Sequence, residues 1–273
     1  MAKFSQTILM CPPDHFEVAY VINPWMEGRL ASTDPDIARR QWDHLRSTIE
    51  LYANVALQPP QPALPDIVFT ANAGLVLGNK AIVSRFRSPE RQGEEAPDRA
   101  WFAENGFDIL DWPRTVAFEG AGDALFNRGQ ELLWVGHGFR SDAAVPGLLH
   151  EMLGRETLAL NLVNPRFYHL DTCLCPLEGG FLMYFPGAFD EKSRALIDRF
   201  VSPDQQIAVD EADALNFCCN AVDLAPHILM NAASDGLQNR LRRAGFTPVI
   251  TPLSEFMKSG GAAKCLTLKL VEH

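Results

Sequence analysis

The sequence predicts an α/β fold that forms a closed ring of five similar units. Three observations lead to this prediction: helical segments recur along the chain, short apolar runs lie between them, and polar residues recur in these runs at nearly constant spacing. The spacing is about 48 residues, so the 273 residues correspond to between five and six repeats. Since five helices are predicted, we expect five units, closed by pairing of the strand around Cys265 with the segment around Asn23.

Five segments have the apolar periodicity and the start signals of amphipathic helices. The first follows Thr33-Asp34-Pro35, and its apolar face consists of Ile37, Trp42, Leu45, Ile49 and Tyr52. The other four are predicted near residues 94–104, 142–153, 190–200 and 234–244. Gly245 follows the last of them and suits a helix end, because glycine readily adopts the left-handed conformation found there.

Short apolar runs between the helices predict strands, for example at residues 67–69, 74–77, 132–135 and 180–185. Polar residues recur at intervals of 49, 47, 50, 51 and 45 positions: Asn23, Asn72, Glu119, His169, Asn220 and Cys265. In a closed ring, each unit presents its polar residue to one central channel. We therefore expect one cluster that contains Asn23, Asn72, Glu119, His169 and Cys265.

The composition excludes several classes of function. The chain has 24 Lys and Arg against 34 Asp and Glu, a net charge of -10, and no basic patch for nucleic acid. Its apolar stretches are shorter than the ~18 residues of a membrane helix, and its first residues lack the apolar core of a signal peptide. Six cysteines in a chain of this length are expected to be free thiols of a cytoplasmic protein. Residues 1–273 are predicted to form a single domain, and association of identical chains stays open.

Residues 259–270, Ser-Gly-Gly-Ala-Ala-Lys-Cys-Leu-Thr-Leu-Lys-Leu, carry the strongest chemical signal in the chain. A glycine pair lets the backbone approach a ligand closely, and it leads into an alternating strand headed by Cys265. By contrast, Cys218-Cys219 and Cys173-x-Cys175 are predicted inside apolar strands. A lone cysteine is more often a core residue than a nucleophile, so a catalytic Cys265 needs a partner.

His169 is the expected partner of this cysteine. In Phe167-Tyr-His169-Leu-Asp171, residues two apart share one face of a strand, which directs His169 and Asp171 toward the channel. An imidazole near a thiol can act as general acid and base, and Asp171 can hold a cation. The alternative is a core histidine that is capped by a neighbouring carboxylate.

Two acids flank a glycine-rich segment upstream. Glu119 and Asp123 surround Gly120 and Gly122, which indicates a tight backbone. Glu119 can then turn inward toward His169 or a ligand. The same segment also fits an ordinary turn rich in Gly and Asp.

Four further residues carry weaker signals. Asp66 and Asn72 stand at the two ends of an apolar run, where they also fit strand caps. Arg91 and Arg140 lie in polar loops punctuated by glycine. Arginine binds carboxylates in a bidentate manner, although most surface arginines are simply solvated.

Metal and cofactor signatures are weak. The chain has no CxxC pair, no HExxH, no P-loop, no GxSxG and no Rossmann GxGxxG. The alternative of a zinc protein that uses Cys173, Cys175 and His169 lacks a second pair of ligands at zinc spacing. We therefore predict neither a metal nor a cofactor.

In these residues the sequence resembles the guanidino-group-modifying superfamily. This superfamily includes arginine deiminases, dimethylarginine dimethylaminohydrolases, amidinotransferases and arginine dihydrolases, and the resemblance is strongest to the last. It runs from about residue 11 to residue 269 and is carried by Met10-Cys-Pro-Pro-Asp-His-Phe16, Val21-Ile-Asn-Pro-Trp-Met26, Phe69-Thr-Ala-Asn-Ala73, Tyr168-His-Leu-Asp171 and Ser259-Gly-Gly-Ala-Ala-Lys-Cys-Leu-Thr267. The fold that it implies is the five-bladed α/β-propeller, or pentein, of pseudo-symmetric ββαβ modules.

The resemblance also implies roles. Cys265 is expected to be the nucleophile, His169 the acid and base, and Glu119 the carboxylate beside them. Asp171 is expected to hold the substrate guanidinium. The remaining residues assigned to substrate binding are Arg91 and Arg140, at the α-carboxylate, together with Asn23, Asn72 and Asp123.

Two departures narrow the expected substrate. Deiminases carry an aspartate where this chain has Asn72, and dimethylarginine enzymes usually lack the acid that is Asp171 here. We therefore expect a metal-free cysteine hydrolase that converts arginine through a covalent thiouronium to citrulline, and on to ornithine, carbon dioxide and ammonia. The alternatives are an arginine deiminase, a dimethylarginine dimethylaminohydrolase and, in another class, a non-enzymatic scaffold. The expected partner is a small guanidino compound, not a nucleic acid or a membrane.

Overall fold

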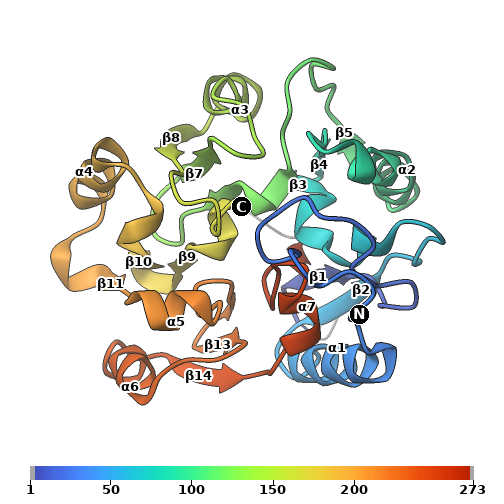
Figure 1. The fold of residues 1–273 in the computed structure, drawn as a ribbon. Helices are drawn as coiled ribbons and strands as arrows, with labels where there is room; N and C mark the ends of the chain where they lie inside the picture. Colours follow the sequence, from blue (N-terminus) through green and yellow to red (C-terminus); the bar gives the residue numbers. More distant parts are fainter. Residues whose placement is uncertain (1–3, 271–273) are drawn as a thin grey trace.

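Small sheets arranged around one axis form the molecule (Figure 1). The computed structural model describes residues 4–270, which form five sheets of three strands each. One helix lies on the outside of each sheet: α1 (Pro35–Ile49), α2 (Glu95–Glu104), α3 (Val145–Leu153), α4 (Glu191–Phe200) and α6 (Asp235–Arg243). The fold is a five-bladed α/β-propeller, which confirms the predicted ring and its five helices.

Each blade follows the order strand, strand, helix, strand. The first two strands are antiparallel, and the third joins the second in parallel after a helical crossover. From the axis outward, the sheets are β15 (Leu268–Lys269), β1 (Thr7–Met10) and β2 (Asn54–Leu57); β3 (Gly74–Leu77), β4 (Lys80–Val83) and β5 (Asp108–Ile109); β6 (Ala124–Phe126), β7 (Leu132–His137) and β8 (Glu156–Asn161); β9 (Leu174–Leu177), β10 (Phe181–Tyr184) and β11 (Gln206–Ala208); β12 (Val222–Leu224), β13 (His227–Met230) and β14 (Thr247–Ile250).

Helix α1 shows how the sequence sets these elements. Asp34 caps its first turn, because its carboxylate accepts from the backbone N–H of residues 36 and 37, and Pro35 occupies the first position. The face that carries Trp42, Leu45 and Ile49 is buried against the sheet. Two short helices, α5 (Glu211–Leu215) and α7 (Ser254–Met257), were not predicted and connect blades.

The ring closes between the two ends of the chain, but not where the spacing placed the closure. β15 pairs antiparallel with β1, with Leu268 opposite Leu9 and Lys269 opposite Ile8. The prediction that the segment around Asn23 pairs there is wrong. That segment is an irregular loop, because prolines interrupt it, whereas residues 8–10 form an unbroken buried apolar run.

Short 3-10 turns precede several of the inner strands. Several segments that were predicted as strands lie in or beside such turns, so these predictions are wrong. Residues 67 and 68 belong to η1 (Pro65–Val68), residue 69 directly follows it, and His169 precedes η5 (Leu170–Thr172). Cys265 and the pair Cys218-Cys219 also lie in turns and not in strands. The other 3-10 segments are η2 (Thr70–Asn72), η3 (Pro89–Glu94), η4 (Gly120–Gly122), η6 (Glu178–Gly180), η7 (Pro186–Ala188) and η8 (Pro203–Gln205).

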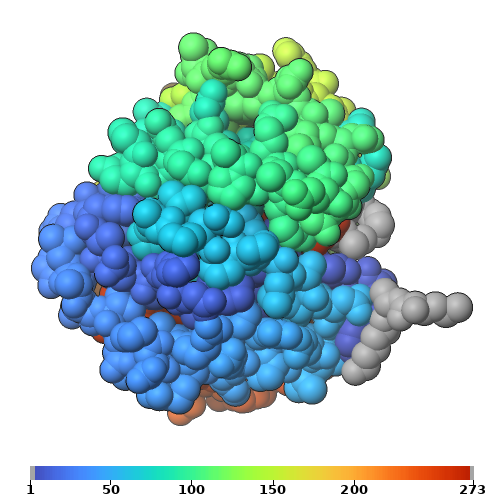
Figure 2. Space-filling model, turned by 90° about the vertical axis from the view of Figure 1, so that its right-hand side faces the viewer, coloured from blue at the N-terminus to red at the C-terminus, as the bar shows by residue number. Residues whose placement is uncertain are grey.

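The core lies between each sheet and its helix and continues from blade to blade. The side view in Figure 2 shows the blue N-terminal part packed directly against the green segment that follows it. Within residues 4–270, no helix combines the length and apolar character needed to cross a bilayer.

Candidate active site

The turns before the inner strands surround a small cavity at one end of the axis. The space in and at the mouth of the cavity measures about 270 Å³, and six of the predicted site residues line it: Asn23, Asn72, Arg91, Arg140, His169 and Cys265. Glu119 and Asp171 lie directly behind this lining, in contact with His169 and Cys265 respectively. The periodic polar residues of the sequence therefore do meet, as predicted.

Cys265 faces the carboxylate of Asp171. The thiol Sγ lies 3.5 Å from Asp171 Oδ2 and 3.7 Å from Oδ1, which makes the thiol the donor in the resting state. Burial, together with the charge of Asp171, raises the pKa of the Cys265 thiol well above its usual value. Burial also raises the pKa of Asp171 to about 7, although Lys264 and two hydrogen bonds oppose this shift. A cation bound beside the two groups would favour the thiolate and the carboxylate together.

His169 and Glu119 form a buried pair. His169 Nε2 lies 2.7 Å from Glu119 Oε2, and neither side chain is exposed. Burial by itself raises the pKa of Glu119, but Arg140 and His169 outweigh it and hold that pKa well below its usual range. Glu119 therefore stays ionised and orients the imidazole, which leaves Nδ1 of His169 for proton transfer.

Arg91 is tied to two neighbours of the cavity. Its Nε and Nη2 donate to the two carboxylate oxygens of Glu94, at 2.9 and 2.8 Å. Its Nη1 donates to Asn72 Oδ1 at 2.9 Å, and Asn72 Nδ2 donates to the backbone oxygen of Glu119 at 2.9 Å. Both ends of the Asn72 amide are thus fixed, and one N–H of Asn72 remains for a ligand.

Arg140 is a second arginine that lines the cavity. Its Nη1 donates to Glu119 Oε2 at 3.3 Å, and its Nη2 donates to the backbone oxygen of Ile22 at 2.9 Å. The guanidinium also covers the ring of Tyr168. Two charges that point into one cavity, Arg91 and Arg140, suit an anionic group of a ligand.

Asp66 is a site residue that the sequence reasoning treated as a strand cap. Its side chain lines the cavity, is 2% exposed, and accepts from the Tyr20 hydroxyl through Oδ2 at 2.9 Å. Its Oδ1 is buried and accepts no hydrogen bond within the described part of the chain. Such an oxygen is costly to leave unpaired, which indicates that a ligand N–H binds it.

A loop of residues 11–33 covers the mouth of the cavity. Asn23 Nδ2 donates to the backbone oxygen of Ser259 at 3.0 Å, and Trp25 Nε1 donates to that of Arg166 at 2.7 Å. These bonds, with that of Arg140 to Ile22, connect the loop to three segments that lie far from it in the sequence. Asn23 therefore reaches the site from the cover and not from a strand.

Two glycines leave the room that the site needs. A Cβ at Gly122 would lie 2.3 Å from Asn72 Nδ2, and one at Gly261 would lie 2.6 Å from the Phe69 ring. Only glycine fits at either position without displacing a cavity residue.

Asp123 is placed differently from the other predicted residues. Its two oxygens accept from the backbone N of Leu170 at 3.0 Å and from the Ser141 hydroxyl at 2.7 Å. It is fully buried and does not line the cavity. Its observed contacts support the backbone next to His169.

The sequence reasoning did not assign a role to Asn220. This side chain is fully buried and donates to Cys265 Sγ at 3.1 Å. The signal was present, because Asn220 occupies the fifth position of the repeat.

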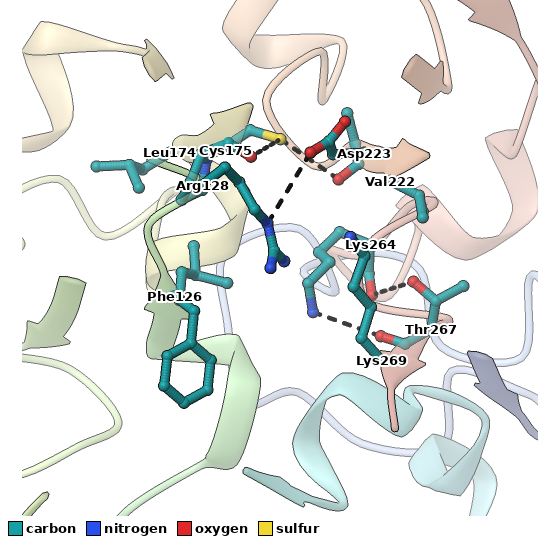
Figure 3. Close-up of a pocket in the computed structure, with 12 residues that line it drawn as sticks. Phe126, Arg128, Leu174, Cys175, Val222, Asp223, Lys264, Thr267 and Lys269 are labelled. Atoms are coloured by element: carbon teal, nitrogen blue, oxygen red, sulfur yellow. Dashed lines mark hydrogen bonds and ion pairs between the residues drawn. The ribbon is translucent and has the colours of Figure 1, made fainter. Parts of the chain in front are cut away.

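A second pocket lies farther along the axis, where the inner strands end (Figure 3). The space in and at the mouth of this pocket measures about 390 Å³, and its lining includes Arg128, Asp223, Lys264 and Lys269. Lys264 and Cys265 are consecutive but serve different cavities. Among residues 4–270, no three or more His, Cys, Asp or Glu side chains are arranged to hold a metal ion. The thiols of Cys173 and Cys175 contact backbone oxygens.

Fold and site together define a class: an α/β-propeller with a cysteine, a histidine and carboxylates around its axis. Comparison with known proteins agrees. The family described as N,N dimethylarginine dimethylhydrolase, eukaryotic, matches residues 38–272. The bifunctional arginine dihydrolase/ornithine cyclodeaminase AgrE of Nostoc is 52% identical over 97% of this chain. The N(G),N(G)-dimethylarginine dimethylaminohydrolase of Mycobacterium tuberculosis is 41% identical over 96% of this chain and 84% of its own length.

A crystal structure gives the same result. The substrate-bound N-terminal domain of ArgZ, an arginine dihydrolase from the ornithine–ammonia cycle in cyanobacteria, superposes with a TM-score of 0.97 at 51% identity, covering 98% of this chain and 99% of that one. The chain spans only 38% of the length of the bifunctional AgrE. This chain belongs to the guanidino-group-modifying superfamily, as a member of the dimethylarginine dimethylhydrolase family.

Proposed function

We propose that this protein is an arginine dihydrolase, a cysteine hydrolase that converts arginine to ornithine, carbon dioxide and two molecules of ammonia. The observation that carries the proposal is the cavity that Cys265, His169 and the amide of Asn72 line together, with the carboxylate of Asp171 directly behind the thiol. The similarity to AgrE and ArgZ, both described as arginine dihydrolases, supports it. A cytoplasmic location fits six buried free cysteines.

The charges in the cavity fit the two ends of arginine. The guanidinium fits beside Asp171, next to the thiol. The α-carboxylate fits Arg140 and the remaining N–H of Arg91, and the α-ammonium fits the unpaired Oδ1 of Asp66. Every charged group of the substrate then has a partner of opposite sign.

The first hydrolysis follows from this pose. A guanidinium carbon is a poor electrophile, so it must be held still while the thiolate adds. His169 takes the thiol proton and passes it to the departing nitrogen, which leaves as ammonia while a thiouronium remains on Cys265. His169 then deprotonates water, which adds to the thiouronium carbon and releases citrulline and the thiol.

The second hydrolysis repeats the same steps on citrulline. Cys265 adds to the ureido carbon, a second ammonia leaves, and a thiocarbamate remains. Water releases a carbamate, which loses carbon dioxide and yields ornithine. Asn72 assists this round, because its free N–H donates to the ureido oxygen, whereas a carboxylate at this position would repel that oxygen.

A second candidate is the hydrolysis of dimethylarginine. The family description and the 41% identical mycobacterial relative favour it. Asp171 opposes it, because a carboxylate that anchors a guanidinium nitrogen leaves little room for methyl groups there.

A substrate panel tests the proposal. The protein is incubated separately with arginine and with asymmetric dimethylarginine, and citrulline, ornithine, ammonia and dimethylamine are quantified. We expect ornithine and ammonia from arginine and no dimethylamine. Dimethylamine as the main product would favour the second candidate, and citrulline as the only end product would indicate a simple deiminase.

A further inference from the structure

Asn220 holds the segment that carries the nucleophile. Its Oδ1 accepts from the backbone N of Ala262 at 3.0 Å and of Cys265 at 3.1 Å. Its Nδ2 donates to the backbone oxygen of Asp171 at 3.0 Å and to Cys265 Sγ at 3.1 Å. Its own backbone oxygen accepts from the N–H of Lys264 at 3.2 Å.

These contacts fix which end of the amide faces the sulfur. Turning the Asn220 amide by 180° would set its NH2 group against two backbone donors and its oxygen against the carbonyl of Asp171. The three backbone partners therefore determine the orientation, and an N–H must point at Cys265 Sγ. The side chain has no exposed surface, so water does not compete for this donor.

The same sulfur has a second, opposite partner. The thiol donates toward Asp171 Oδ2 at 3.5 Å, an arrangement that stabilises the protonated sulfur. Once the proton leaves, Asp171 repels the negative charge, and the N–H of Asn220 gains strength because its acceptor is now an anion.

We propose that Asn220 is a catalytic residue that stabilises the thiolate of Cys265 through its Nδ2–H. The inference rests on the proposed role of Cys265 as the nucleophile. Burial and the charge of Asp171 favour the protonated thiol. The hydrogen bond from Asn220 opposes both effects and raises the fraction of thiolate at the moment of attack. When sulfur adds to the guanidinium carbon, its charge disappears and this hydrogen bond weakens.

Two variants test the assignment from different sides. Asn220→Asp keeps an oxygen for the backbone N–H groups of Ala262 and Cys265 but replaces the donor with a negative group. Asn220→Ala removes the donor without adding charge. Asn231→Asp is the matched control, since Asn231 is a buried asparagine that donates to the sulfur of Met257 at 3.2 Å, away from the cavity.

The readout is the rate at which iodoacetamide alkylates Cys265 at pH 8, located by peptide mass, with thermal melting as the check on folding. Below the thiol pKa, this rate is proportional to the thiolate fraction. A hydrogen bond to a charged group corresponds to a rate decrease of roughly ten- to one-hundred-fold. We expect this decrease in both Asn220 variants, a parallel fall in kcat/KM for arginine, and an unchanged rate in the control.

Alkylation of folded Asn220→Asp and Asn220→Ala within twofold of the wild-type rate would overturn the inference. If the wild type does not hydrolyse arginine while the variants still slow alkylation, the proposed function fails and the thiolate assignment stands. If Cys265→Ser retains full turnover, Cys265 is not the nucleophile and both fail.

Discussion

Arg91 Nη1 donates to Asn72 Oδ1 at 2.9 Å, in a buried pair at the edge of the cavity. Because Glu94 holds the other side of the guanidinium, Arg91 has little freedom to turn. The amide of Asn72 is therefore fixed as a donor toward the cavity. In the proposed reaction this donor binds the ureido oxygen of citrulline and retains it for the second hydrolysis.

Replacing this amide with a carboxylate should stop the reaction at citrulline. In Asn72→Asp, an oxygen faces the backbone oxygen of Glu119 and repels the ureido oxygen, while the guanidinium gains a negative partner. We expect citrulline to replace ornithine as the main product. Chromatographic quantification of both products over time measures this change. An unchanged ratio would exclude Asn72 from the second step.

Crowding the same amide should have a related effect. Gly122→Ala brings a methyl group to 2.3 Å from Asn72 Nδ2, so the amide must shift. We expect a loss of stability of about 1–3 kcal/mol and less ornithine per citrulline. Gly147→Ala, in α3 with no atom near the new methyl group, is the control and should stabilise by about 0.5–1 kcal/mol. Equal behaviour of the two variants in melting and product assays would contradict the account.

Asp171 should link activity and stability to pH in opposite directions. Burial raises its pKa to about 7 in the folded protein, from an ordinary value of 3.8. Between these values the folded state binds more protons, so Asp171 costs increasing stability as pH rises from about 4 to 7, and the full cost remains above 7. Asp171→Asn should therefore increase the free energy of unfolding at pH 8 by up to about 4 kcal/mol, which raises the melting temperature. The same variant should have no turnover. A variant that melts below the wild type at pH 8 would show that the charge is stabilising.

The wild-type pH profile gives a separate test of Asp171. The protonated carboxyl does not hold a guanidinium, so kcat/KM for arginine should fall as pH drops below about 7. Glu119 should not contribute to this limb, because its pKa lies far below neutrality. Steady-state rates measured from about pH 5.5 to about pH 9 cover the expected pKa of Asp171 and record this fall in kcat/KM. A flat profile down to pH 5.5 would contradict the assignment.

Glu119 should act through His169. Glu119→Gln keeps the shape of the side chain but removes the charge that orients the imidazole at 2.7 Å. We expect kcat to fall roughly 10²- to 10⁴-fold, with a much smaller change in KM. Asp213→Asn, a buried carboxylate that accepts from Ser234, is the control and should keep its kcat. A wild-type kcat in Glu119→Gln would show that the charge of Glu119 is not needed to orient His169.

The sequence predicted the blades well because each of the five outer helices buries an apolar face, and three of them begin at a capping side chain: Asp34 for α1, Asp190 for α4 and Ser234 for α6. It failed at short segments. A three-residue apolar run such as 67–69 fits a strand or a 3-10 turn equally well, and the neighbouring proline decided the outcome. The position of ring closure was predicted wrongly. Asn23 fits the polar spacing, but the loop that carries it does not pair as a strand.

The site was predictable only where chemistry and spacing coincided, as at Cys265, His169 and Glu119. Asp66 looked like a cap because nothing in the sequence indicates that its Oδ1 is left unpaired in a cavity. Glu94 lies within a polar stretch, and only the fold shows that it binds Arg91 in a bidentate manner. Such contacts depend on which turns the ring brings together.

The most direct measurement of the central claim is the stoichiometry of arginine hydrolysis by the wild type and by Cys265→Ser. We expect two ammonia molecules and one carbon dioxide for each ornithine from the wild type, and no turnover from Cys265→Ser although it still binds arginine. Undiminished hydrolysis by Cys265→Ser, or a wild type that leaves arginine intact, would contradict it.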